Sequence, residues 1–320
     1  MSSGVRRLAP LLPLVAILAA GCTDSPDPVY PEEPESEALS TAYDPTLEPS
    51  AAALPLVPAE ATVLEVTDFD QLRLTLGFAA LDEESTPGEL DRFWRALDGA
   101  ATLSAGLLRP AAAELASYGF GAEDVAWEAS YSGDAEGWII AFHDGVPMAR
   151  VQDAIDEGVG VLAGATLDAD RALVTSETPP EGSDSWAAIE ETRDLVGQEA
   201  NATYVERGCL PFDTVFGDGM EGQLAEAPRA ALKALDPLEG FSVALGQDLV
   251  TVRLGPLRDD GFDRLRLAEV MPAIRPEFGA GFSRGVADPS TGRLGYDLQR
   301  PSAAVELIED RHLPFAVCGD

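Results

Sequence analysis

Short segments in which apolar and polar residues alternate recur along the chain, and they constrain the fold more than any other feature. Alternation with a period of two is typical of β-strands. Residues 125–131 (VAWEASY) and 138–142 (WIIAF) flank SGDAEG, whose composition indicates a turn between antiparallel strands. Residues 240–245 and 249–254 have a similar pattern around GQD. The sequence therefore predicts β-hairpins in both halves of the chain.

Segments with helical spacing lie between these strands. Asp68 is an N-cap candidate for the first helix, because its carboxylate can accept a backbone N–H. The elements predicted within residues 56–180 are a strand at 61–67, helical segments at 69–76 and 88–117, the first hairpin, a helix at 147–158 and a strand at 171–176. This β-α-β-β-α-β order is the split β-α-β pattern of ferredoxin-like folds.

Residues 201–320 repeat the pattern. The elements predicted there are a strand at 203–207, a helix at 223–235, the second hairpin, a helix at 261–271, a hairpin turning at 288–292, a helix at 302–310 and a strand at 313–317. Residues 181–200 are expected to form a connecting helix, centred on 185–198. The predicted fold class is α+β, with two tandem ferredoxin-like (split β-α-β) units and antiparallel sheets.

The first 21 residues have the composition of an export signal. Arg6 and Arg7 precede a short apolar run over residues 8–20. A helix that spans a bilayer needs about 20 apolar residues, so a run of this length is typical of a secretion signal. The structured part of the chain is thus expected to follow a signal peptide.

Residues 18–22 (LAAGC) resemble the lipobox of bacterial lipoproteins. The sequence departs from that motif at Ala19, where Leu is usual. The resemblance implies a signal peptide over residues 1–21, and acyl chains, palmitate among them, on Cys22 as the new N-terminus. It also implies anchoring to the extracytoplasmic face of the cell membrane, since two acyl chains hold a protein firmly there. The alternative is an ordinary cleaved signal peptide with an incidental cysteine.

Residues 22–55 are rich in Pro, Asp, Glu and Ser and contain no basic residue. Such a composition buries too little apolar surface to offset chain entropy. We therefore expect a disordered acidic tether between the anchor and the folded part of the chain.

A second resemblance covers most of the mature chain. Residues 57–63 (VPAEATV), 66–69 (VTDF), 122–127 (AEDVAW) and 313–318 (LPFAVC) are similar to segments of a poorly characterised group of secreted lipoproteins from high-G+C bacteria. The composition agrees with a genome rich in G+C, because lysine has A-rich codons and Lys233 is the only lysine in the chain. The resemblance implies a fold and a location but no activity.

Cys209 and Cys318 are the two remaining cysteines, and an even pair in an exported chain is best interpreted as a disulfide. In the predicted second unit they would end neighbouring first and last strands. The bond would close a loop of about 110 residues and contribute about 4–5 kcal/mol under the chain-entropy model. A reactive or metal-binding thiol pair is the alternative, but no CxxC spacing supports it.

The charge balance excludes some partners. The chain has 56 acidic and 21 basic side chains and a formal net charge of -35. Nucleic-acid binding requires clustered Lys and Arg, so we expect no nucleic-acid partner. The same excess argues against adhesion to anionic lipid through a basic face.

Residues 281–285 (GFSRG) match the GxSxG nucleophile elbow, and His312 follows in the expected chain order. An elbow requires a buried strand before Ser283 and a helix directly after it, whereas this sequence predicts a hairpin turn. We therefore assign no catalytic residue. Acidic groups at 68–70, 168–170 and 259–263 could bind calcium, but none matches an EF-hand loop. With only His143 and His312 as histidines, we expect neither a metal site nor a cofactor.

These observations favour a lipid-anchored envelope protein with a non-enzymatic binding or structural role. Two alternatives stay open. One is an exported hydrolase that uses Ser283 or a carboxylate pair in the cleft between the units. The other is a substrate-binding lipoprotein for a cationic or sugar ligand. We expect a monomer that contacts the membrane through its anchor and binds an envelope protein or a small ligand.

Overall fold

The computed structural model describes residues 41–79, 81, 85–256 and 258–319, which belong to one compact unit. This unit is α+β and contains a ten-stranded antiparallel sheet with the order β4-β5-β3-β2-β1-β6-β7-β8-β10-β9. The strands are β1 (Ala61–Asp68), β2 (Val125–Gly133), β3 (Gly137–Phe142), β4 (Thr166–Asp168), β5 (Leu173–Thr175), β6 (Ala202–Arg207), β7 (Gly240–Leu245), β8 (Leu249–Arg253), β9 (Ser283–Asp288) and β10 (Arg293–Asp297).

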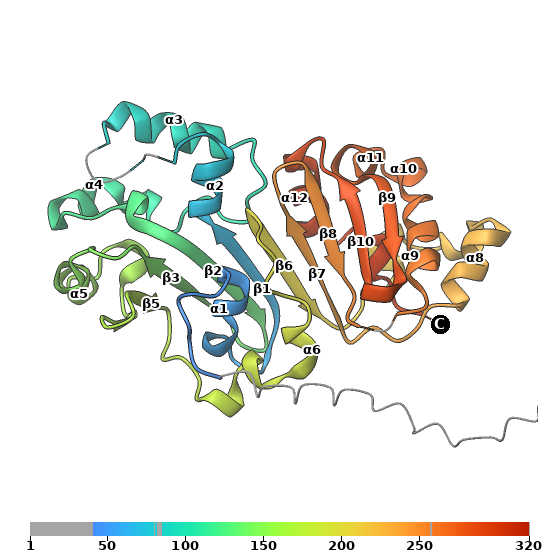
Figure 1. The fold of residues 1–320 in the computed structure, drawn as a ribbon, viewed down its shortest axis with the longest axis horizontal. Coiled ribbons are helices and arrows are strands. Elements are labelled where there is room, and N and C mark those ends of the chain that lie inside the picture. Colours follow the sequence, from blue (N-terminus) through green and yellow to red (C-terminus); the bar gives the residue numbers. More distant parts are fainter. Residues whose placement is uncertain (1–40, 80, 82–84, 257, 320) are drawn as a thin grey trace, which may run out of the picture. The chain divides into compact units, whose positions relative to one another are not determined.

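Helices flank both ends of the sheet (Figure 1). They are α1 (Pro49–Ala52), α2 (Phe69–Thr75), α3 (Pro87–Leu97), α4 (Ala112–Leu115), α5 (Met148–Asp156), α6 (Glu190–Arg193), α7 (Phe212–Phe216), α8 (Glu226–Lys233), α9 (Gly261–Ala268), α10 (Met271–Ile274), α11 (Phe278–Gly281) and α12 (Pro301–Glu309). Figure 1 shows α2–α5 at the β3–β5 end and α8–α11 at the β9 end. None of the described helices has the length and apolar character needed to cross a bilayer.

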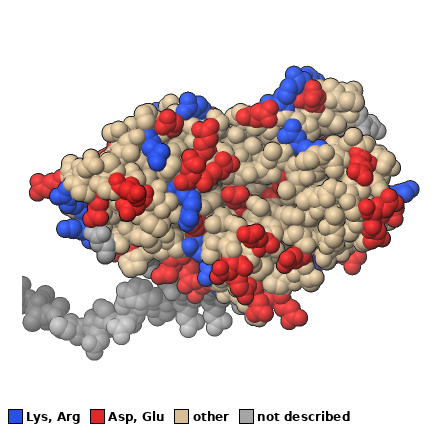
Figure 2. All heavy atoms as spheres, turned by 180° about the vertical axis from the view of Figure 1, so that it is seen from behind, with Lys and Arg blue, Asp and Glu red and all other residues tan. Residues whose placement is uncertain are grey.

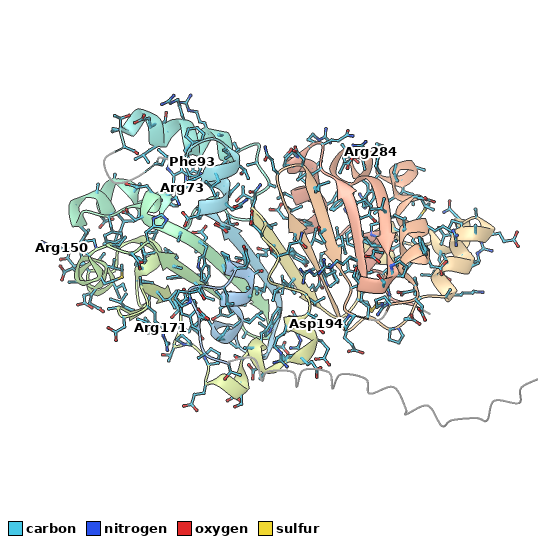
Figure 3. All side chains as sticks on the ribbon, in the orientation of Figure 1. Arg73, Phe93, Arg150, Arg171, Asp194 and Arg284 are labelled. Atoms are coloured by element: carbon cyan, nitrogen blue, oxygen red, sulfur yellow. A yellow bond between two sulfur atoms is a disulfide. The ribbon has the colours of Figure 1, made fainter. Side chains whose placement is uncertain are left out.

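Side chains at the helix starts explain two of these boundaries. The Asp68 carboxylate accepts a hydrogen bond from the Gln71 N–H, as the sequence predicts for an N-cap. Thr86 and Glu89 form a reciprocal capping box at the start of α3. Arg73 on α2 then lies 5.7 Å from the ring centroid of Phe93 on α3, which holds the two helices together (Figure 3).

The strand order differs from that of two tandem split β-α-β units, which are not confirmed. In such a unit the first and last strands are neighbours. Here β1 pairs with β2 and β6, and β5 pairs with β3. The β1–β2 and β1–β6 pairings join segments that are far apart in the chain, so long-range contacts set this strand order. The β1–β6 pairing joins residues 56–180 and 201–320 in one continuous sheet.

The connecting helix expected over residues 185–198 is replaced by short turns and α6. The backbone of this segment is bonded to another part of the chain. The Trp186 N–H donates to Val57 O (2.9 Å), and Asp184 O accepts from the Ala59 N–H (2.8 Å). These bonds, together with the full burial of the Trp186 side chain, outweigh the helical spacing.

The two ends of the body also differ from expectation. Residues 49–56 form α1 and a 3-10 turn whose Ala52, Leu54 and Leu56 are buried, so the expected tether does not extend unfolded to residue 55. At the other end, the predicted strand at 313–317 is a 3-10 turn, Pro314–Ala316, followed by a single parallel bridge between Val317 and Leu210.

Three apolar clusters divide the interior. Two lie on one face of the sheet, which we call the helix-covered face: one packs beneath α2–α5, and the other beneath α8–α12. The third lies on the opposite face, where α1 and the turns around Trp186 cover β1–β3. The two clusters of the helix-covered face are separated along β2, β1 and β6, and this separation positions the candidate site.

Candidate functional site

Polar side chains occupy the helix-covered face between its two apolar clusters. Strand register brings them together. Glu65 on β1 is opposite Ser130 on β2 and Tyr204 on β6, and Thr67 is opposite Glu128. Directly opposite residues share one face of a sheet. We call the group formed by Glu65, Thr67, Glu128, Ser130, Tyr204 and Glu206 the polar seam.

Glu128 fastens a loop across this seam. Its side chain is fully buried and accepts hydrogen bonds from the Leu107 N–H (3.0 Å) and the Ser104 hydroxyl. The Thr67 hydroxyl accepts from the Leu103 N–H (3.2 Å) in the same loop. Burial raises the pKa of the Glu128 carboxyl, although these donors partly oppose that effect.

Glu206 is the second buried acid of the seam. The Tyr204 hydroxyl donates to it at 2.6 Å, and Arg311 forms an ion pair with its other oxygen. Arg311 follows α12 and has a positive φ of 57°, so this pair links β6 to the end of α12. Burial and the neighbouring Glu206 carboxylate raise the pKa of the Tyr204 hydroxyl. Tyr204 therefore stays protonated and acts as a donor.

Glu65 is the most accessible acid of the seam. The Ser130 hydroxyl donates to it at 3.2 Å. Burial raises the pKa of its carboxyl, and the charge of Glu309 on α12 raises it further. A cavity of about 290 Å³ lies between α12 and the loop that Glu128 holds, and Glu309 lines it. Glu65 and Glu309, from the two halves of the chain, therefore lie close enough for the charge of Glu309 to act on Glu65.

On the face that Figure 2 shows, the acidic side chains do not gather into one site. Figure 2 shows Asp and Glu in several separate patches, with a short run of Lys and Arg between some of them. Among the described residues, no group of three or more His, Cys, Asp or Glu side chains has the geometry to hold a metal ion. A larger hollow of about 600 Å³ lies beside β4 and β5 and is lined by residues 41–43, 55–56, 166–171 and 179–180, among others.

The disulfide between Cys209 and Cys318 is confirmed, with Cα atoms 4.9 Å apart. The reason given by the sequence, neighbouring first and last strands, is not the one that the structure shows. Cys209 follows β6, and Cys318 follows the bridge between Val317 and Leu210. Cys22, the predicted lipidation site, lies outside the described residues.

Ser283 is the first residue of β9, a strand at the end of the sheet, and a hairpin to β10 follows it. Its hydroxyl donates to Asp297 O at 3.2 Å. His312 lies after α12, where its Nδ1 is 3.7 Å from a carboxylate oxygen of Asp310. The strand-Ser-helix geometry of a nucleophile elbow is therefore not the local structure around Ser283.

His143 belongs to a small ionic cluster. Its Nε2 lies 2.7 Å from Asp70 Oδ1 and 3.3 Å from Arg73 Nη1. Arg73 also donates to the carbonyl oxygens of Glu123 (2.7 Å) and Val125 (3.0 Å), which ties α2 to the start of β2. Burial raises the pKa of Asp70, but its hydrogen bond with His143 and the charges of His143 and Arg73 bring it below the ordinary value.

Three further acids considered as calcium ligands have protein partners. Asp68 caps α2, and Asp168 pairs with Arg171 at 3.3 Å. Asp260 is almost fully buried and pairs with Arg258 (2.6 Å) and Arg264 (2.7 Å). Each of these contacts is structural, because it fixes a helix start, a turn or the C-terminal segment.

Sequence reasoning did not identify the polar seam. Glu65, Glu128 and Glu206 occupy polar positions of alternating strands, and such positions usually face solvent. A glutamate inside each of three strands is a weak signal, and it has meaning only once the strand order is known.

Comparison of the chain with protein-family models, with curated proteins and with solved structures finds no match.

Proposed function

We propose that this chain is an exported envelope protein, lipid-anchored at Cys22, whose α+β body has a non-enzymatic binding or structural role outside the cytoplasm. The Cys209–Cys318 disulfide carries the proposal, since disulfides persist in oxidising compartments. The lipobox-like residues 18–22 support the anchor. The partner is an envelope protein or a small ligand, and the protein acts as a monomer.

The two buried acids of the polar seam support a structural role rather than chemistry. The carboxyl groups of Glu128 and Glu206 are engaged by donors from the chain itself. A general base must reach the proton that it abstracts, and a buried acid held by internal donors is poorly placed for this. Their hydrogen bonds instead fix the loop at residues 103–107 and the end of α12 at the border between the two apolar clusters.

Membrane fractionation of the full chain in its host tests the anchor. We expect the wild type in the membrane fraction and Cys22→Ser either released or unprocessed. Ala19→Leu is the matched control, because it restores the usual lipobox residue and should remain anchored. Equal membrane retention and normal processing of Cys22→Ser would contradict the proposal.

A hydrolase is the second candidate, and the raised pKa of the Glu65 carboxyl favours it. A carboxyl whose pKa is raised by burial and by a neighbouring acid can act as a general acid. Hydrolysis of chromogenic glycosides or esters by the wild type, abolished in Glu65→Gln but retained in Ser283→Ala, would establish this carboxylate mechanism. Loss in Ser283→Ala alone would favour the serine alternative instead.

A further inference from the structure

In the described part of the chain, no helix covers the outer strands β8, β10 and β9 on the face of the sheet opposite the helix-covered face (Figure 1). The side chains that these strands present there are exposed or half-buried. Register arranges them in rows across the strands. In one row Arg253 is opposite Arg293, and Arg293 is opposite Asp288; in the next, Gly295 lies between Thr251 and Val286.

The opposition of Arg253 and Arg293 is unfavourable in isolation. Like charges directly opposite each other destabilise a sheet. The chain has 56 acidic against 21 basic side chains, so an acidic neighbour would be the ordinary outcome at this position. Burial lowers the pKa of the Arg253 guanidinium, and the charge of Arg293 lowers it further.

The two guanidinium groups retain free donors. Arg253 uses Nη1 to bond the carbonyl oxygens of Asp194 (3.3 Å) and Val196 (2.9 Å), which fixes its position beside this loop. Arg293 is exposed and has no hydrogen bond within the part of the chain that the structure describes, although its charge acts on the opposite Asp288. Asp194 lies at one end of the sheet surface formed by β8, β10 and β9, and Arg284 on β9 lies at the other end (Figure 3).

The arginines border a groove of about 510 Å³. Thr251 and Gly295 lie in the middle row of its floor. Gln198 Nε2 donates to the Thr251 hydroxyl at 2.8 Å, and Val286 is 64% exposed on the other side. A Cβ at Gly295 would lie 3.2 Å from Val286 Cγ2, so a larger residue at this position would crowd Val286 and fill part of the groove.

Two acids lie close to the arginines: the charge of Asp194 acts on Arg253, and Asp288, which also lines the groove, interacts electrostatically with Arg293. The Asp288 carboxylate accepts hydrogen bonds from Ser290 and Thr291 in its own turn. Asp194 contributes its carbonyl oxygen to Arg253, and its side chain is exposed to solvent. More distant acids are screened over about 8 Å at physiological ionic strength.

We propose that this groove binds a phosphomonoester, whose dianionic phosphate pairs with Arg253 and Arg293 while the esterified group lies over Gly295 beside Val286. Two guanidinium groups match a dianion in charge, and their planar forks suit phosphate oxygens. The exposed Val286 side chain and the glycine floor suit an apolar or flat substituent. This inference deepens the binding role proposed above by naming its ligand class.

Isothermal titration of the full-length protein with phenyl phosphate tests the site. We expect saturable binding to the wild type, weakened at least about tenfold in Arg293→Gln, which is the effect of ~1.4 kcal/mol. Gly295→Val, which fills the floor and keeps both arginines, should weaken binding similarly. Arg150→Gln on α5 removes another exposed arginine and should bind as the wild type does. Absence of binding to the wild type, or equal binding by Arg293→Gln, would overturn the proposal.

Flotation with vesicles distinguishes a soluble phosphomonoester from a lipid headgroup. Phosphatidylcholine vesicles with and without phosphatidic acid are compared, with Cys22→Ser protein to remove the anchor. Phosphatidic-acid-dependent flotation that Arg293→Gln abolishes assigns the site to a headgroup, and phenyl phosphate binding without flotation assigns it to a soluble ligand. Neither result depends on membrane anchoring, so failure of the anchor proposal and failure of this one are separate outcomes.

Discussion

Leu210 and Val317 form a single parallel bridge, and the disulfide closes immediately beside it. Leu210 N donates to Ala316 O (2.8 Å), and Cys318 N donates to Leu210 O (2.9 Å). The two cysteines are therefore brought together by a local bridge after β6 and not by neighbouring strands of a split β-α-β unit. The covalent bond and the bridge fix the end of the chain against the start of its second half.

The first prediction concerns the effect of this disulfide on the cooperativity of unfolding. Cys209→Ser with Cys318→Ser should lower the free energy of unfolding by about 4–5 kcal/mol under the chain-entropy model. Because β1 and β6 belong to one sheet, we expect both halves to unfold together. All four tryptophans lie between residues 94 and 186, outside the disulfide loop, so Trp fluorescence reports the part of the chain that precedes β6.

Urea titrations followed by Trp fluorescence and by far-UV circular dichroism make the comparison. Both midpoints should shift equally in the double variant. A fluorescence midpoint that stays unchanged while the dichroism midpoint falls would show that the two halves unfold independently, despite their shared sheet.

The second prediction concerns Asp68. Burial raises the pKa of its carboxyl to about 7, and the nearby acids Asp70 and Glu48 contribute to this shift. The folded protein therefore binds more protons than the unfolded chain between pH ~4 and ~7, and this group makes stability fall as pH rises through that range. Asp68→Asn keeps the N-cap but cannot ionise.

Thermal unfolding of both proteins across pH isolates the contribution of this group. The two melting temperatures should agree near pH 4, and Asp68→Asn should melt higher at pH 8. A lower melting temperature of the variant at pH 8 would mean that the charged carboxylate stabilises α2 through its dipole more than burial penalises it.

Sequence patterns identified the local features of this fold better than its long-range order. The hairpins β2–β3, β7–β8 and β9–β10 follow from turn composition and alternation, which act within about 20 residues. The position of β1 between β2 and β6 depends on contacts that no local pattern specifies. The side chain of Glu128 faces inward as a consequence of that strand order. The segment around Trp186 does not form its predicted helix, because its backbone makes hydrogen bonds to another part of the chain.

The third prediction concerns the buried cluster at the C-terminal end. Asp260 accepts from Arg258 and Arg264, and Arg264 Nη1 donates to the carbonyl oxygens of Phe315 (2.9 Å) and Val317 (3.1 Å). Asp260→Asn leaves two buried cations without their counter-charge, so it should lower the free energy of unfolding by about 3–5 kcal/mol.

Asp263→Asn is the matched control, because Asp263 forms a more exposed pair with Arg266 at 2.9 Å. Its effect in the same urea titration should be below about 1 kcal/mol. Equal effects of the two variants would remove the buried cluster as a determinant of stability.

The last prediction concerns Glu128 and the loop that it fastens. Glu128→Ala removes the acceptor of the Leu107 N–H and should expose the bond before Leu107 to thermolysin, which cleaves on the N-terminal side of leucine. Glu128→Gln keeps an acceptor of similar shape and should be cleaved at a rate close to that of the wild type. Glu136→Ala, in the exposed β2–β3 turn, controls for the loss of a carboxylate. Rapid cleavage of Glu128→Ala alone would show that hydrogen bonding, not charge, closes the loop over the polar seam; equal cleavage of all four proteins would mean that the Thr67 contact suffices.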